Sequence, residues 1–161
     1  MRRVIVNSTP IILLSNINQL ELLKQLYETI TIPQAVYDEV TAKPDSACQN
    51  LKNHFDWIKV EKIRNPIQKK MYEAKLHDGE VEVMILAQEE LKADLVILDD
   101  NSAKKTAKFL ELSVTGTLGV LVKAKQLNYI EKVKPLMDAL IANGFFVTQN
   151  VYSMVLEQAG E

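Results

Sequence analysis

The sequence is poor in the residues that mark several specialised classes of protein. It contains one cysteine, Cys48, so no disulfide can form within the chain, and we expect it in a reducing compartment, the cytoplasm. Its 5 glycines and 5 prolines are scattered, and the sequence has neither an internal repeat nor a low-complexity segment. No stretch approaches the ~20 consecutive apolar residues of a membrane-spanning helix. We therefore expect no membrane association.

The sequence also lacks an excess of charge of either sign. The 21 acidic and 19 basic side chains give a formal net charge of −2, so the chain as a whole does not attract polyanions. Contact with a nucleic acid would have to depend on a local basic patch or on a metal ion. With 161 residues, of which 47% are hydrophobic and 25% charged, the composition predicts a single globular domain over residues 1–161.

Short β-branched runs alternate with helical patterns along the chain. Strands separated by helices indicate right-handed crossovers and a mostly parallel sheet with helices on both faces. The predicted strands are Arg3–Val6, Thr29–Ile32, Trp57–Val60, Leu95–Leu98 and Leu112–Thr115. The predicted helices are Leu20–Tyr27, Pro33–Ala42, Ser46–His54, Pro66–Leu76, Gly79–Leu91, Ser102–Leu110, Thr117–Leu127, Glu131–Ala142 and Gln149–Ala159. The sequence thus predicts an α/β fold with a five-stranded sheet.

Three residues are predicted to begin helices. Pro33 suits a first helical position, where its missing N–H is not needed. Asp78 and Thr148 are expected to cap the helices that follow them, because their side chains can accept hydrogen bonds from first-turn N–H groups.

Polar side chains follow three of the predicted strands. Asn7, Ser8 and Thr9 come after the first strand, Asp99 and Asp100 after the fourth, and the segment 115–117 ends the fifth. In parallel sheets, ligands bind at the carboxyl ends of the strands, where the strand order reverses. These residues are therefore expected to lie near one another.

Glutamates on two helices add further carboxylates that could reach this edge. Glu39 lies on the predicted inward face of its helix, and Glu80 lies in the first turn of the helix from Gly79. Glu82 is rotated by about 200° from Glu80, so at most one of the two faces a given site. Periodicity alone does not choose between them, because this helix is apolar on nearly every side.

Carboxylates gathered in a cleft bind hard divalent cations, of which Mg²⁺ and Mn²⁺ are the natural choice for oxygen ligands. Such an ion keeps positions for a phosphate and an attacking water, which suits phosphodiester hydrolysis. It would also let an acidic protein bind an anionic substrate.

Five segments in this order resemble a known family. They are NSTPIILLSNINQLELLKQLY, TIPQAVYDEV, DGEVEVMILA, LVILDDNSAKKTA and VTGTLGVLVKAK. Together they resemble a PIN-like domain, and more narrowly its uncharacterised subfamily with a GE-rich helix and a DD-x-x-A-[RK] motif. The likeness extends over essentially the whole chain. It implies a three-layer sandwich around a central, mostly parallel sheet, and a Mg²⁺- or Mn²⁺-dependent ribonuclease acting on single-stranded RNA, of the kind found in toxin–antitoxin pairs.

The resemblance also assigns residues to the site. The acidic quartet of the family falls on Asn7, Glu39, Glu80 and Asp100, with Asp99 as an adjacent candidate. Glu80 and Asp100 are the first choices for metal ligands, supported by Asp99 and Asn7. The resemblance also implies a small antitoxin protein as a partner and allows a homodimer.

The sequence departs from the family pattern in three features. The usual further acid after the last strand is absent, and Thr115, Gly116 and Thr117 stand there. Asn7 stands where aspartate is usual, and an amide oxygen can ligate a cation but brings no charge. Lys104 stands where arginine is frequent, so the charge remains while bidentate phosphate contact is lost. The substrate phosphate is expected to contact a set of small or basic side chains, namely Thr9, Lys104, Thr115 and Thr117.

Other readings of the same residues stay open. Asp99 or Asp100 could serve only to accept N–H groups at a helix start, and Asn7 with its neighbours is expected to cap the next helix in any case. Asn7 also allows a catalytically weakened module that binds RNA or a protein without cleavage. A phosphate-transfer domain of the response-regulator type would need an acidic pair after the first strand and a lysine after the last, and the sequence has neither.

Overall fold

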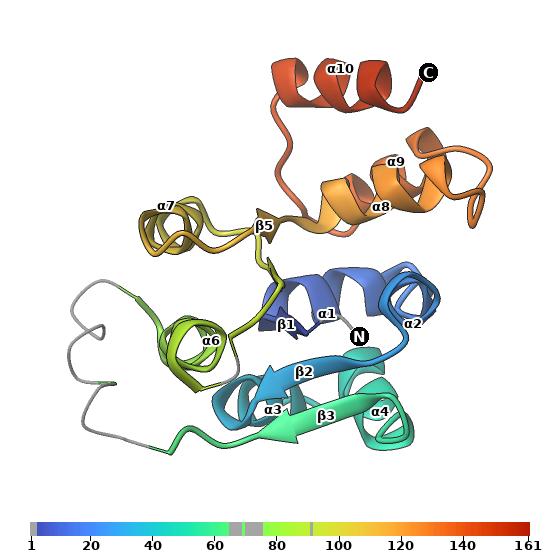
Figure 1. Cartoon of the computed structure of the whole chain (residues 1–161). Coiled ribbons are helices and arrows are strands. Elements are labelled where there is room, and N and C mark those ends of the chain that lie inside the picture. The colour runs from blue at the N-terminus through green and yellow to red at the C-terminus, as the bar shows by residue number, and fades with distance from the viewer. Residues whose placement is uncertain (1–2, 65–68, 70–75, 91) are drawn as a thin grey trace.

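A computed structural model describes residues 3–64, 69, 76–90 and 92–161 of the chain (Figure 1). It has an α/β fold with five strands and, in this described part, nine α-helices. The strands are β1 (Val4–Val6), β2 (Ile30–Pro33), β3 (Ile58–Glu61), β4 (Leu95–Ile97) and β5 (Val114–Thr115). The helices are α1 (Ser8–Asn16), α2 (Glu21–Tyr27), α3 (Gln34–Thr41), α4 (Ser46–Asn53), α6 (Asp78–Ile85), α7 (Asn101–Phe109), α8 (Thr117–Gln126), α9 (Lys134–Ala142) and α10 (Gln149–Gln158). The helix predicted over Pro66–Leu76 falls largely outside the described residues.

The five strands form one sheet in the order β3-β2-β1-β4-β5, and every neighbouring pair is parallel. The predicted mostly parallel sheet is therefore confirmed. The chain order reverses between β1 and β4, which pair from Val4 with Leu95 to Val6 with Ile97. The crevice beyond the carboxyl ends of these two strands is the usual ligand position in such sheets.

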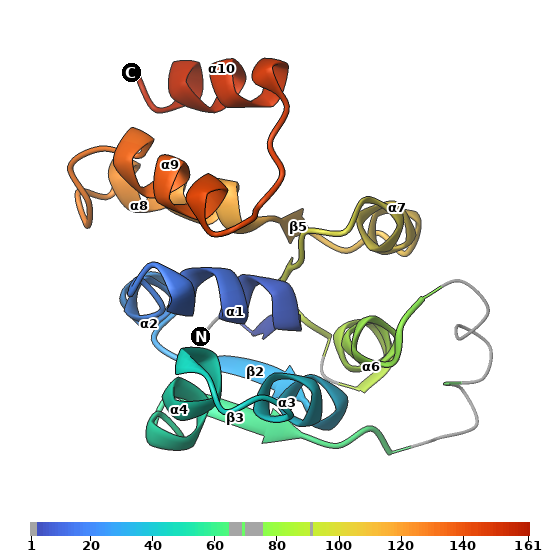
Figure 2. The same cartoon turned by 180° about the vertical axis from the view of Figure 1, so that it is seen from behind.

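Helices cover the sheet and extend beyond its carboxyl edge. The two opposite views show α3 and α4 on one side of β2 and β3, while α6 and α7 lie beyond the arrowheads of the strands (Figures 1 and 2). The last helices, α8, α9 and α10, are stacked away from β2 and β3. No helix in the described part of the chain is long and apolar enough to cross a membrane.

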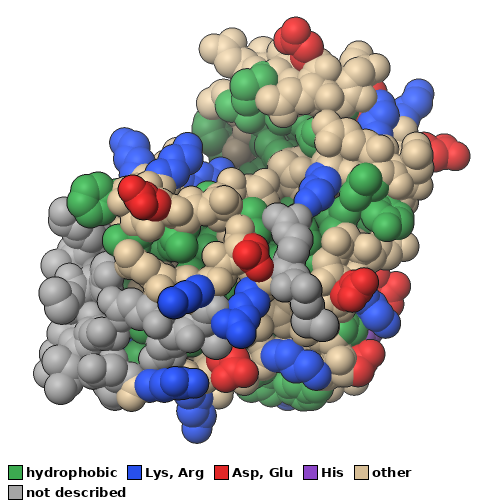
Figure 3. Space-filling view, viewed as in Figure 1, with side chains coloured by type: hydrophobic (Ala, Val, Ile, Leu, Met, Phe, Trp, Pro, Cys, Tyr) green, Lys and Arg blue, Asp and Glu red, His purple; other side chains and the backbone are tan. Residues whose placement is uncertain are grey.

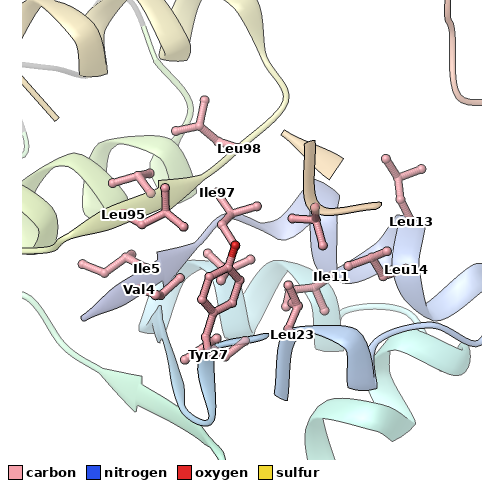
Figure 4. Close-up of a cluster of buried hydrophobic side chains, with 14 of the residues drawn as sticks. Val4, Ile5, Ile11, Leu13, Leu14, Leu23, Tyr27, Leu95, Ile97 and Leu98 are labelled. Carbon is pink, nitrogen blue, oxygen red and sulfur yellow. The ribbon is translucent and has the colours of Figure 1, made fainter. Parts of the chain in front are cut away.

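The core forms where the central strands meet α1 and α2. Ile5 and Ile97 from the strands pack with Ile11, Leu14 and Leu23 from the helices, and all five are essentially inaccessible to solvent (Figure 4). Burial of one such side chain stabilises the fold by about 1.5–3 kcal/mol relative to its exposure. Because the central strands are buried on both faces, their carboxyl ends are held rigidly.

The fifth strand is shorter than the predicted Leu112–Thr115, and the end of α7 explains the difference. Glu111 adopts a left-handed conformation with φ 62°, and the Leu112 N–H donates to the Ala107 carbonyl at 2.9 Å. This is the hydrogen-bond pattern of a Schellman motif, which closes the helix. Because the Leu112 N–H bonds to α7 and not to a neighbouring strand, β5 begins only at Val114.

Three predicted helix boundaries are wrong in detail. Pro33 is the last residue of β2 and the N-cap of α3, not a helical residue. Asp78 is the first residue of α6, whose N-cap is His77, so Asp78 does not cap it. The predicted helix Gly79–Leu91 is an α-helix only to Ile85 and continues as a π-helix over Leu86–Glu90. Thr148 does cap α10, accepting a hydrogen bond from the Val151 N–H at 3.2 Å.

Candidate active site

Asn7 marks the crevice between β1 and β4. Its backbone N–H donates to the Ile97 carbonyl at 2.9 Å, which fixes it at the carboxyl end of β1. It occupies the N-cap position of α1, yet its side chain makes no capping hydrogen bond, contrary to the sequence expectation. The side chain is only 4% exposed, and its Oδ1 atom is buried without a hydrogen-bond partner. A buried, unpaired amide oxygen is costly unless something else occupies that position.

Glu80 and Asp100 are brought together from segments 20 residues apart in the sequence. Glu80 lies in the first turn of α6 and Asp100 immediately before α7, and the two carboxyls are near enough for the charge of Asp100 to act on Glu80. Glu80 is 6% exposed, and its Oε2 atom is buried without a partner. The structure therefore brings the carboxyl of Glu80 near that of Asp100.

The surroundings of Glu80 favour its neutral form. Burial is the largest cause that raises the pKa of the Glu80 carboxyl, and the negative charge of Asp100 raises it further. The His77 backbone N–H and the charge of the His77 imidazole act in the opposite direction and lower this pKa. The net effect is a raised pKa, so ionised Glu80 is held in a position that a cation would stabilise.

The adjacent Asp99 and Asp100 are each placed at the start of a different helix. Asp100 caps α7, since its Oδ2 atom accepts a hydrogen bond from the Ala103 N–H at 2.9 Å. Asp99 points to α8, where its two oxygens accept from the Thr117 N–H at 2.9 Å and the Thr117 hydroxyl at 2.7 Å. Helix N-termini favour negative charge, which explains how two neighbouring carboxylates are tolerated. The capping role considered from the sequence is thus present for Asp100, together with its proximity to Glu80.

The absence of a side chain at Gly116 lets Lys104 and Asp99 approach each other. A Cβ atom at Gly116 would lie 2.8 Å from Asp99 Oδ1 and 3.0 Å from Lys104 Nζ. The lysine ammonium group therefore lies at the edge of the acidic cluster, next to the carboxylate that binds α8.

The threonines expected to contact phosphate differ in accessibility. Thr9 is exposed on the first turn of α1. Thr115 is half-buried, and its hydroxyl occupies the space that a side chain at Gly119 would take. Thr117 is fully buried and its hydroxyl donates to Asp99, so contact with a phosphate would require this hydrogen bond to open.

Glu39 reaches the same region from α3. A Cβ atom at Gly79 would lie 3.5 Å from Asn7 Oδ1 and 3.6 Å from Glu39 Oε2, so both oxygens approach the first turn of α6 at this glycine. Glu39 is exposed and lines a hollow of about 740 Å³ between the starts of α3 and α6. Glu80 and Asp100 do not line this hollow, which reaches the first turn of α6 through Gly79 and Glu82.

Glu82 has a structural role that the sequence did not reveal. It is buried, accepts a hydrogen bond from the Ala35 N–H at 3.0 Å, and forms an ion pair with Lys69 at 3.0 Å. It thereby supplies the negative charge at the start of α3, whose own N-cap is Pro33. Of the two glutamates left open by periodicity, Glu82 serves α3 and Glu80 faces Asp100. Helical periodicity does not distinguish them, whereas their tertiary contacts do.

The oxygen atoms around Glu80 fit a hard divalent cation. The described residues contain no group of three His, Cys, Asp or Glu side chains placed to hold an ion together. The available donors are instead the neighbouring carboxyls of Glu80 and Asp100 and the amide oxygen of Asn7. Of these, Glu80 Oε2 and Asn7 Oδ1 are buried without a hydrogen-bond partner. Such all-oxygen donor sets suit Mg²⁺ or Mn²⁺, which retain several waters and need few protein ligands.

Comparison with family models places the chain among known proteins. A family model described as a PIN domain matches residues 3–161, which is nearly the whole chain. The search of curated proteins finds no match.

The raised pKa of Glu80 makes stability depend on pH in a predictable direction. Between the unfolded pKa of Glu80 and its higher folded pKa, the folded protein binds more protons, so its stability falls as the pH rises through this window. We expect Glu80→Gln, measured by thermal unfolding in EDTA, to raise the melting temperature at pH 7 and to lose this advantage toward pH 4. Glu157→Gln, on the exposed face of α10, is the matched control. A Glu80→Gln protein that melts below the parent at pH 7 would show that the carboxylate is already satisfied.

Replacement of Glu82 should lower the stability of the protein, whereas replacement of Glu80 should raise it at pH 7. Glu82→Ala leaves the Ala35 N–H without its acceptor and removes the ion pair with Lys69, so we expect urea unfolding to show a loss of about 1.5–3 kcal/mol. Unchanged stability in Glu82→Ala would contradict the assignment of this glutamate to α3.

Proposed function

Because this chain belongs to the PIN domain family, we propose that it is a metal-dependent endoribonuclease that cleaves single-stranded RNA. PIN domains are generally nucleases that use divalent metals such as Mg²⁺ or Mn²⁺. The observation that carries the proposal is that Glu80 Oε2 and Asn7 Oδ1 are buried without hydrogen-bond partners, while the charge of Asp100 acts on Glu80.

Glu80 and Asp100 are the residues that would hold the ion, with Asn7 as a neutral oxygen donor. Asp99 already accepts two hydrogen bonds from Thr117, but each carboxylate oxygen retains a lone pair, so Asp99 can support the same ion. When bound, the ion would activate water and neutralise the scissile phosphate. Lys104 at the edge of the cluster and the exposed Thr9 would contact the phosphate from the protein side, with Thr115 as a further donor. Glu39, across Gly79 from Asn7, would orient water.

A second candidate function assumes the same fold but no cleavage of RNA. Asn7 supplies an amide where a carboxylate is usual, which lowers the negative charge that attracts the cation. In this alternative, the chain binds RNA or a protein partner as a catalytically weakened module.

We also propose two binding partners, a small antitoxin protein and a second copy of the chain. Many PIN domains are toxins of toxin–antitoxin pairs, so a small antitoxin protein encoded by a neighbouring reading frame is expected to bind the acidic site. A homodimer is a second proposed assembly, which sedimentation or light scattering of the isolated chain would reveal.

Metal binding can be measured apart from cleavage. Mn²⁺ binds only the folded site, so it should raise the melting temperature of the parent protein. We expect this rise to disappear in Glu80→Gln and in Asp100→Asn, since asparagine still caps α7 but brings no charge. Glu157→Gln should retain the full rise. An equal Mn²⁺ response in all four proteins would place the ion elsewhere.

Cleavage of a single-stranded RNA separates the two functions. If the chain is active, Asp100→Asn should lower Mn²⁺-dependent cleavage by more than about 100-fold, because loss of a ligand exceeds the effect of an outer contact. Asn7→Asp should leave the rate intact or increase it. Cleavage that appears only in Asn7→Asp would favour the weakened module, and cleavage unaffected by Asp100→Asn would contradict the proposed site.

A further inference from the structure

Helix α7 carries a basic and aromatic face of which the proposed catalytic site uses only Lys104. At 100° per residue, one side of the helix brings Lys104, Lys108, Lys105 and Phe109 into an arc of about 140°. The opposite side is buried through Ala103 and Ala107. We call the side formed by Lys104, Lys105, Lys108 and Phe109 the α7 face.

Lys105 and Lys108 of the α7 face are exposed, whereas the Nζ atom of Lys104 lies near Asp99. None of them forms an ion pair with a described residue, and α7 itself contains no acid. Lys104 and Lys108 are four residues apart, so their like charges repel along the helix. Figure 3 shows Lys and Arg side chains above the position of α7, with one acidic and one hydrophobic side chain beside them. On a chain with a net charge of −2, this local excess of positive charge is complementary to a polyanion.

Phe109 adds an aromatic ring to these charges. It is 86% exposed, and Lys105 lies one turn before it on the same face. An aromatic ring exposed next to lysines provides both parts of a single-strand site, a stacking surface for a base and charge for the phosphates. A base paired within a duplex is not free to stack on a side chain in this way.

The α7 face begins at the catalytic cluster and leads away from it. Asp100 caps the helix, Lys104 Nζ lies near Gly116 and Asp99, and Phe109 is the last residue of α7. Nine residues at 1.5 Å each separate Asp100 from Phe109 by about 14 Å along the helix axis. A short single-stranded segment that enters the cluster can therefore extend along the lysines to the phenylalanine.

We propose that the α7 face binds the single-stranded RNA substrate outside the cleavage point, with Lys105 and Lys108 contacting phosphates and Phe109 stacking on an unpaired base. This inference rests on the proposed function, because it takes RNA as the ligand of the adjacent cluster. It names Phe109 as a binding residue that the family motif does not contain.

The test measures binding in a background that cannot cleave. The full chain carrying Glu80→Gln is titrated into a fluorescein-labelled 12-nucleotide single-stranded RNA without secondary structure, and separately into a 12-base-pair RNA duplex, over a range of salt concentrations. The variants are Phe109→Ala, Phe109→Tyr and a double variant that combines Lys105→Gln and Lys108→Gln. The matched controls are Phe146→Ala, because Phe146 is 82% exposed, and Lys52→Gln, because Lys52 is exposed on the distant α4.

Phe109→Ala should weaken single-strand binding by about 5-fold or more, because stacking on one aromatic side chain contributes about 1–3 kcal/mol. Phe109→Tyr should restore it, and duplex binding should be unchanged by either. The double lysine variant should reduce the salt dependence of single-strand binding by about 0.7 in the logarithmic slope for each lysine removed. Both controls should bind like the parent.

Three results would overturn the inference. The first is that Phe109→Ala binds single-stranded RNA within 2-fold of the parent affinity. The others are that Phe146→Ala loses as much RNA affinity as Phe109→Ala, or that the parent does not bind single-stranded RNA. A change in oligomeric state on Phe109→Ala with unchanged RNA affinity would assign the ring to a protein interface instead.

Failure of the proposed function can be distinguished from failure of this inference. Binding through the α7 face without cleavage by the unsubstituted chain would reject the nuclease alone, whereas cleavage with an unchanged KM in the α7 variants would reject this inference alone.

Discussion

The site depends on helix N-termini that meet at one edge of a parallel sheet. Because each strand is followed by a helix, the carboxyl edge gathers the positive ends of α6, α7 and α8, and each of these ends lies next to one acid of the cluster: Glu80, Asp100 and Asp99. Each such placement stabilises a carboxylate by about 0.3–1 kcal/mol, and up to ~2 kcal/mol when partly buried. This explains why Asp99 and Asp100 can be adjacent, since each is stabilised by a different helix. It is not sufficient for Glu80, whose pKa remains raised by burial and by Asp100.

The contrast between Glu80 and Glu82 shows how one short helix serves both the fold and the site. Glu82 is buried with a backbone donor and an ammonium partner, so its charge is compensated within the chain. Glu80 is buried with an unpaired oxygen and a second carboxyl near it. A buried polar atom without a partner lowers stability, and proteins retain such atoms mainly where a ligand completes them. The same reasoning applies to the amide oxygen of Asn7, which neither caps α1 nor finds another donor.

The sequence predicts the fold better than the site. The alternation of apolar runs and helical patterns predicts the five parallel strands, and local capping chemistry predicts the start of α10 at Thr148. The shortening of β5 depends on the left-handed Glu111, which no pattern in the sequence indicates. The hydrogen bonds of Asp99 to Thr117 and of Glu82 to Ala35 join residues far apart in sequence, so they follow from packing and not from periodicity. The choice of Glu80 over Glu82 came from the family resemblance, since helical geometry alone left both open.

The central claim is that Asn7, Glu80 and Asp100 direct their oxygens to one position that a divalent cation occupies. The most direct measurement is a crystal structure of the unsubstituted chain grown with Mn²⁺, with anomalous scattering used to locate the ion. We expect a single strong anomalous peak between the carboxyls of Glu80 and Asp100, with the Asn7 amide oxygen directed toward it. A peak elsewhere on the chain would contradict the account, as would clear density with the Glu80 and Asp100 carboxyl oxygens at hydrogen-bonding distance and no ion between them.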